Sequence, residues 1–328
     1  MDALPQRPGS LIRRLALAFV LALPVLAAGA TVARAADPVI MAAGDIACDG
    51  PGSATPGDCS HLYTSNLALS QKNSAEGLAA LLAVGDLQYE NASLAQFGRG
   101  FGPTWGRLAL RSVLRPVPGN HEYQTSGAAG YFGYFSSIGV NVGQRGQGFY
   151  SYDIATWHLV ALNSSNACSP VACGPTSAQY KWLDADLKAT QKNCILAYWH
   201  HPLQNLPASG RSIWTLLYNA GVDFVLVGHQ HIYRAPRAIN PNGSSDPNGP
   251  REVIVGTGGR SGGKYGLLKM TLHANSADWK FVGSGSSNSG SAGTTWRVSP
   301  SSSASTSRPA PSSRTRALSR WVAKIVAS

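Results

Sequence analysis

Short apolar segments recur along residues 38–272, and most of them end in glycine or a polar residue. Apolar runs of this length, bounded by turn residues, predict β-strands. The tripeptide Ala155-Thr156-Trp157 joins two of the segments, which are expected to form a hairpin. The predicted strands are residues 38–43, 81–84, 113–117, 149–154, 158–162, 195–199, 224–227, 252–255 and 267–272.

Two of the stretches between the strands carry a clear helical pattern. Residues 178–189 place apolar side chains on one face, and either Thr176 or Ser177 is expected to cap the helix. Residues 212–220 predict a second helix, which Gly221 ends. Helices that fall between strands place the chain in the α/β class.

The first 35 residues have the composition of an export signal. Three arginines precede an apolar run at residues 15–28, and Ala33-Arg34-Ala35 is a cleavage site before Ala36. The run is short for a membrane span, which takes about 20 residues, so cleavage is favoured over a retained anchor. Arg13-Arg14 fits a twin-arginine signal as well as an ordinary one. We expect residues 1–35 to be a signal peptide and the protein to be secreted, periplasmic or at the cell surface, with no transmembrane segment after cleavage.

Residues 283–328 form a second region of distinct composition, rich in Ser, Gly and Pro. Such a composition cannot bury enough apolar surface to offset chain entropy, which predicts a flexible tail. The formal net charge of +11 lies mainly in this tail and in residues 1–35, so the intervening body is nearly neutral. We therefore expect no stable nucleic-acid partner. The tail is either dispensable or a contact to a cell wall or another anionic surface.

Five cysteines in an exported chain predict disulfides rather than a metal cage. The closest pairs in the sequence are Cys48 with Cys59 and Cys168 with Cys173, which would leave Cys194. Pairing of Cys194 with Cys168 or with Cys173 is an equally allowed alternative.

Polar residues follow five of the predicted strands directly. Sites in α/β sheets form at the carboxyl ends of strands, so these residues are expected to share one cleft. Their carboxylate, amide, phenol and imidazole groups suit first-row metals such as Fe, Zn and Mn. Three further histidines, His61, His158 and His273, lie outside the clusters and are expected to have ordinary structural roles. The clusters are Gly44-Asp45, Gly85-Asp86-Leu87-Gln88-Tyr89, Gly119-Asn120-His121-Glu122, His200-His201 and Gly228-His229-Gln230-His231.

In this order, the clusters resemble the motifs of the calcineurin-like metallophosphoesterase superfamily, and most closely those of purple acid phosphatases and their bacterial relatives. The resemblance runs from about residue 39 to residue 259 and includes residues 198–202 and 255–259. It implies an α/β fold of two mixed β-sheets packed as a sandwich, with helices on the outer faces. Residues 36–282 would be the catalytic domain.

The resemblance also implies a dinuclear metal site, with iron paired with zinc, manganese or a second iron. Asp86 would bridge the two ions, and Asp45 and His231 would bind the first. The second ion would be bound by Asn120, His200 and His229.

Tyr89 occupies an informative position in this pattern. Most of the superfamily begins with Asp-x-His, whereas here Ile46-Ala47 follow Asp45. Purple acid phosphatases also lack that histidine and use a tyrosine three residues after the bridging aspartate, where this chain has Tyr89. The resemblance therefore implies a phenolate ligand, which favours Fe(III); the alternative is an aromatic side chain packed beside the site.

The expected reaction is hydrolysis of a small phosphate monoester. Two cations roughly 3.5–4 Å apart would clamp a phosphate and acidify a bound water, and the hydroxide formed would attack phosphorus. His121 is the candidate proton donor to the leaving group, with Glu122 as an orienting partner. His201 either lies on the substrate side or exchanges roles with His200. Asn120, His121 and His201 are the expected substrate contacts.

Two other functions compete with this expectation. A phosphodiesterase on the same scaffold would differ in the loops that shape the cleft, in residues 91–115, 124–147 and 204–211. A non-catalytic protein that binds a surface through its basic tail is the second alternative.

Overall fold

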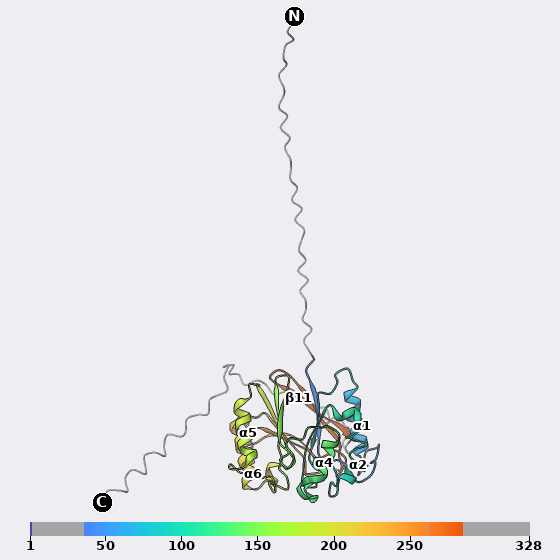
Figure 1. Cartoon of the computed structure of the whole chain (residues 1–328). Coiled ribbons are helices and arrows are strands. Elements are labelled where there is room, and N and C mark those ends of the chain that lie inside the picture. Colours follow the sequence, from blue (N-terminus) through green and yellow to red (C-terminus); the bar gives the residue numbers. More distant parts are fainter. Residues whose placement is uncertain (2–35, 261, 285–328) are drawn as a thin grey trace, which may run out of the picture. The chain divides into compact units, whose positions relative to one another are not determined.

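The computed structural model in Figure 1 describes residue 1, residues 36–260 and residues 262–284. The predicted signal peptide and nearly all of the predicted tail lie outside the described residues. The described strands form two mixed sheets, as expected. The first has the order β11-β10-β1-β2-β3, with β1 at Val39–Ala43, β2 at Ala80–Val84, β3 at Leu114–Val117, β10 at Tyr265–Leu272 and β11 at Ala277–Ser284.

The second sheet has a parallel centre and antiparallel edges. Strands β5, β6, β7 and β9 run parallel, whereas the edge strands β4 and β8 run antiparallel to their neighbours. The order is β4-β5-β6-β7-β9-β8, with β4 at Tyr150–Ile154, β5 at Trp157–Ala161, β6 at Cys194–Tyr198, β7 at Phe224–Val227, β8 at Tyr233–Ala238 and β9 at Arg251–Val255.

The main apolar core lies between the two sheets. It joins side chains of both, such as Leu82 of β2 and Leu159 of β5. The next residue of β5, Val160, points to the other face and joins a second cluster with side chains of α5 and α6. Because both faces of the central strands are buried, these strands are apolar throughout, which is why the sequence pattern predicts them well.

Helices cover the outer faces of the paired sheets. Figure 1 shows α5 and α6 on one side and α1, α2 and α4 on the other. Ser177 caps α5, since its side chain accepts the Tyr180 N–H. Of the two predicted capping residues, Thr176 and Ser177, the second is therefore correct. The helices are α1 at His61–Lys72, α2 at Leu94–Arg99, α3 at Leu108–Arg111, α4 at Ala129–Ser137, α5 at Ala178–Ala189 and α6 at Ala208–Asn219.

Two strands were not predicted, and both are sheet edges. Strand β8 carries Arg234, Pro236 and Arg237, and its side chains are largely exposed. Edge strands face solvent and tolerate charge and proline, so their sequences lack the apolar run of a central strand. Strand β11 continues to Ser284. The strand thus includes the first two residues of the predicted tail.

Two disulfides confirm the pairing of cysteines that are nearest in sequence. Cys48 is bonded to Cys59 and Cys168 to Cys173, with Cα atoms 5.4 Å and 5.3 Å apart. Cys194 is a buried free thiol, so its alternative pairings are excluded. Among the residues that the structure describes, there is no helix long and apolar enough to cross a membrane.

His158 joins β4, β5 and α5 through an ionic network. Its Nδ1 lies 2.8 Å from the Asp153 carboxylate and its Nε2 lies 2.8 Å from the Asp186 carboxylate. Burial opposes the charged ring, but the bonds to Asp186 and Asp153 outweigh it and raise the pKa of His158. A raised pKa in the folded state stabilises the protein below the unfolded pKa of about 6.5, and this contribution is lost as pH rises through the folded value.

We predict that His158→Gln lowers the free energy of unfolding by about 2 kcal/mol at pH 5 and by less at pH 9, because hydrogen bonds to a charged group are lost. Urea denaturation at pH 5 and at pH 9 measures the two losses in the free energy of unfolding. Lys188→Gln, which removes an exposed helix-surface pair with Asp184, is the control and should change little. An equal loss at both pH values would contradict a charged His158.

Candidate metal centre

The site residues lie where strands of both sheets end. Asp45 follows β1 and Asp86 follows β2, whereas His200 and His229 follow β6 and β7 of the other sheet. Asp45, Asp86 and His229 have φ values of 58°, 49° and 67°, in the left-handed region that side chains rarely adopt. Backbone strain of this kind concentrates at functional sites, where surrounding contacts hold it in place.

A first group of donor atoms gathers around the Tyr89 hydroxyl. Its oxygen lies 3.0 Å from Asp45 Oδ1, 3.3 Å from Asp86 Oδ2 and 3.1 Å from His231 Nε2. His231 Nε2 also lies 3.2 Å from Asp45 Oδ1. Three of these groups, Asp45, Tyr89 and His231, are the ones that the resemblance assigned to the first ion, and the fourth, Asp86, is the expected bridge.

A second group gathers around the Asn120 side-chain oxygen. Asn120 Oδ1 lies 3.2 Å from His200 Nε2 and 3.1 Å from His229 Nδ1. His200 Nε2 lies 3.1 Å from Asp86 Oδ2. The structure thus brings together the residues that the sequence assigned to the second ion.

A single carboxylate oxygen belongs to both groups. Asp86 Oδ2 contacts Tyr89 on one side and His200 on the other. Donor atoms of Asp45, Asp86 and His200 all lie within 4.8 Å of one another, as do ring nitrogens of His200, His201 and His229. Carboxylate, phenol, amide and imidazole groups packed this closely fit a pair of first-row metal ions.

Charge is concentrated at the centre of the site. Burial opposes ionisation of Asp86, but the His200 ring beside it holds the pKa of the Asp86 carboxyl well below its usual range. Against the same burial, the Asp86 charge raises the pKa of His200 to about 9. Burial and the charges of Asp45 and Asp86 raise the pKa of the Tyr89 phenol well above its ordinary value. Asp86 and His200 are thus held as a buried ion pair at the centre of the site.

Glycines leave the space that these side chains occupy. A Cβ on Gly85 would lie 2.5 Å from the His200 ring, and one on Gly119 would lie 2.3 Å from Asp86 Oδ1. Gly85 also has a φ of 75°. Both positions therefore need glycine for the strand ends to approach one another.

Glu122 connects the loops that follow β2 and β3. Its buried carboxylate accepts the backbone N–H groups of Asp86 at 3.0 Å, Leu87 at 2.9 Å, Gln88 at 3.2 Å and Gly119 at 2.7 Å. Burial and the nearby Asp86 charge raise the pKa of Glu122 to about 7, against these donors. The expectation that Glu122 orients the His121 ring is therefore wrong, because its oxygens are used by the backbone.

His121 lies beside the site, with its ring centroid 4.2 Å from that of Tyr89. Its backbone N–H donates to Asp86 Oδ1 at 2.8 Å, its Nδ1 contacts the Glu90 carbonyl oxygen, and its Nε2 lies 3.9 Å from Asp86 Oδ2. A carbonyl oxygen accepts only, so Nδ1 carries a hydrogen and Nε2 is the nitrogen directed toward the centre.

His201 packs on the opposite group. Its ring centroid lies 4.9 Å from His200 and 4.4 Å from His229, and its Nδ1 lies 2.8 Å from Ser164 Oγ. Burial, with the neighbouring rings of His200 and His229, lowers the pKa of His201 to about 2. His201 is thus a neutral ring beside the site.

Two further residues of the site were not predicted. Ser164 follows β5 without any motif around it, so the sequence carries no signal for it. The Arg260 guanidinium lies 5.3 Å from the centre of the Tyr89 ring and 2.8 Å from Glu90. Arg260 comes directly after residues 255–259, which the resemblance included. This position in the sequence could have indicated that Arg260 lies near the site.

The remaining histidines have other partners, as expected. His61 bonds to the Gly50 carbonyl oxygen, and His158 lies between Asp153 and Asp186. His273 lies between Asp37 and Asp278.

Comparison with known proteins agrees with this fold and site. The family model described as calcineurin-like phosphoesterase matches residues 38–233, more than half of the chain, and the chain belongs to that family. Its relatives include purple acid phosphatases. Purple acid phosphatase 18 of Arabidopsis thaliana is 32% identical over 126 residues, which cover 35% of this chain and 28% of that protein.

One further relative and one solved structure extend the match. Acid phosphatase type 7 of Homo sapiens is 26% identical over 215 residues, covering 55% of this chain and 48% of that protein. The structure of purple acid phosphatase PPD1 from yellow lupin seeds matches with a TM-score of 0.62 at 17% identity, over 80% of this chain and 54% of that chain. The chain therefore has the fold of a purple acid phosphatase, but spans between about a quarter and half the length of these curated relatives.

We predict that Glu122→Gln weakens metal affinity about 10- to 100-fold and lowers the free energy of unfolding by about 2 kcal/mol. An amide has one acceptor oxygen, so its NH₂ group would face backbone N–H groups that now find a carboxylate. Titration calorimetry with Zn²⁺ and urea denaturation measure the two effects.

The control is Glu252→Gln, which alters another buried carboxylate that accepts a backbone N–H, from Leu203 at 2.8 Å. It should lower stability without changing metal affinity. If Glu122→Gln binds metal as tightly as the wild type does, Glu122 does not position Asp86.

Proposed function

We propose that the chain is an exported phosphoric ester hydrolase that acts on small phosphate monoesters and holds two metal ions. One observation carries the proposal: Asp86 Oδ2 belongs to two separate groups of metal-binding side chains. An oxygen shared in this way would let one carboxylate hold two neighbouring ions, the arrangement in which two cations clamp a phosphate.

The described donors divide between the two ions. Asp45, Tyr89 and His231 would hold the first ion, Asn120, His200 and His229 would hold the second, and Asp86 would contact both. When bound, two adjacent cations neutralise phosphoryl charge and acidify a water into a nucleophile. A phenol and a carboxylate on the first ion favour iron there, with zinc, manganese or a second iron at the other position.

His121 supplies the proton in this proposal. Its Nδ1–H is held by the Glu90 carbonyl oxygen, so a proton added at Nε2 faces the centre of the site. The ring is 23% exposed, which leaves it open to a substrate. A proton on Nε2 can be donated to the leaving oxygen of the ester, which would otherwise depart as an alkoxide.

Export is supported by covalent chemistry in the described residues. Disulfides persist in oxidising compartments and are rare in the cytosol. The Cys48–Cys59 bond closes the loop directly after Asp45, and the Cys168–Cys173 bond closes the loop after Ser164. Both bonds therefore stabilise segments beside the site, as an enzyme working outside the reducing cytosol would require.

Hydrolysis of two related esters tests the substrate class. We predict that the metal-loaded protein hydrolyses 4-nitrophenyl phosphate faster than bis(4-nitrophenyl) phosphate, because a monoester presents more oxygens and more charge to two cations. Release of 4-nitrophenol is followed by absorbance, and protein stripped of metal by a chelator is the control. Faster hydrolysis of the diester would favour a phosphodiesterase, and no hydrolysis of either ester would contradict the proposal.

A further inference from the structure

Ser164 and His201 form a buried pair at the edge of the proposed site. Ser164 Oγ lies 2.8 Å from His201 Nδ1, and the His201 backbone N–H donates to the same oxygen at 3.2 Å. Ser164 is 4% exposed and His201 is 3% exposed, so water does not compete for these bonds. The serine thus touches the histidine at two points.

The hydrogens of this pair can be assigned from its geometry. A hydroxyl group has one hydrogen to donate and two lone pairs that accept. Within residues 36–260 and 262–284, His201 Nδ1 is the acceptor found for the Ser164 hydroxyl hydrogen, since the other contact of Oγ is a bond that it accepts. The hydroxyl therefore donates to Nδ1, and in the neutral ring the remaining hydrogen is on Nε2.

This tautomer determines what the ring can bind. An imidazole nitrogen that carries hydrogen has no lone pair for a metal ion, but it donates to an anionic oxygen. The His201 ring lies against the rings of His200 and His229, which the proposed function assigns to the second ion. In the proposed function the substrate anion would bind beside these rings, where a donor on His201 would serve it.

We infer that Ser164 is a positioning residue that holds His201 as the Nε2–H tautomer, so that His201 donates a hydrogen bond to a phosphate oxygen of the substrate and does not bind metal. The inference rests on the proposed phosphate-ester function. It separates His201 from His200, two neighbouring histidines whose roles the sequence alone left interchangeable.

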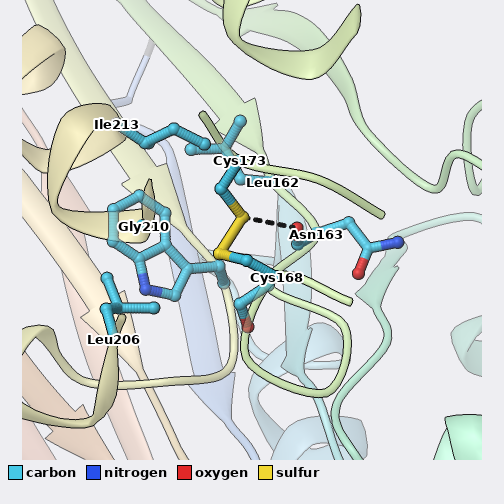
Figure 2. A pocket seen from close by; sticks show the side chains of 9 residues that line it. Leu162, Asn163, Cys168, Cys173, Leu206, Gly210 and Ile213 are labelled. Carbon is cyan, nitrogen blue, oxygen red and sulfur yellow. Dashed lines mark hydrogen bonds between the residues drawn. A yellow bond between two sulfur atoms is a disulfide. The ribbon is translucent and has the colours of Figure 1, made fainter. Parts of the chain in front are cut away.

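The loop that carries Ser164 is constrained by local contacts. Ser165, Ala167 and Cys168 all have left-handed φ values, of 40°, 51° and 71°, and the Cys168 N–H donates to the Ser164 carbonyl oxygen at 2.5 Å. The Cys168–Cys173 disulfide closes the loop. Figure 2 shows this disulfide beside Asn163, where it lines a small cavity with Leu162, Leu206, Gly210 and Ile213.

Asn163 connects the loop to the rest of the site. Its side-chain amide donates to the Tyr123 hydroxyl at 2.7 Å, and Tyr123 follows Glu122. Its backbone is held by Gln179 of α5, which accepts its N–H at 2.7 Å and donates to its carbonyl oxygen at 2.9 Å. Such support fixes Ser164 before substrate arrives, which is what a positioning residue requires.

The tautomer is tested in metal-free protein by ¹⁵N NMR of the histidine rings, which distinguishes protonated from unprotonated ring nitrogens. We expect His201 to carry its hydrogen on Nε2 in the wild type and in Ser164→Thr, which keeps the hydroxyl. Ser164→Ala should lose this preference. His201→Gln identifies the His201 signals. A hydrogen on Nδ1 in the wild type would overturn the inference, whatever the enzyme does.

The role toward phosphate is tested in metal-loaded protein. We expect Ser164→Ala and His201→Gln to keep the wild-type metal content and to bind inorganic phosphate about tenfold more weakly by calorimetry, the loss of one hydrogen bond to a charged group. Ser164→Thr should bind like the wild type. Loss of an ion from His201→Gln, or unchanged phosphate binding in both variants, would overturn the inference.

These outcomes can be told apart from failure of the proposed function. If the wild type holds its metals and binds phosphate but hydrolyses neither ester, the proposed function fails while the assigned role of His201 as a phosphate donor stands. If the wild type binds no phosphate when loaded with metal, both fail.

Discussion

The site depends on one buried carboxylate whose hydrogen-bond partners are backbone N–H groups. Glu122 accepts backbone N–H groups from the loop after β2 and from the loop after β3, and it thereby joins the two strand ends. Within this frame Asp86 adopts its left-handed backbone, and its Oδ1 accepts the His121 N–H. The other carboxylate oxygen, Oδ2, is then free to point between the two groups of donors.

The site also needs both sheets, because each sheet contributes part of the donor set. Asp45, Asp86 and Asn120 come from the ends of β1, β2 and β3, whereas His200 and His229 come from the ends of β6 and β7. Carboxylates thus arrive mainly from one sheet and imidazoles from the other, across a shared apolar core. Gly85 and Gly119 allow the closest approaches, since any side chain there would meet His200 or Asp86.

Much of this arrangement was predictable, for identifiable reasons. Central strands such as β6 are buried on both faces and end in polar residues, so apolar runs revealed the strands and the polar clusters that follow them. The arrangement in two sheets was implied by the resemblance to metallophosphoesterases. Edge strands β8 and β11 have no such apolar run, so the sequence analysis did not predict them. Ser164 was missed because its role depends on contact with His201, 37 residues away, which no local pattern records. Glu122 was noticed, but its partners are backbone groups whose positions only the folded chain determines.

Metal analysis of Asp86→Asn tests whether a single carboxylate oxygen is common to two ions. After purification from the same metal-containing medium, the wild type should hold about two ions per chain. Asp86→Asn should lose both, and Asp153→Asn, which alters a carboxylate of the His158 network, should keep both. Retention of two ions by Asp86→Asn would contradict a shared Asp86 oxygen as the basis of the site.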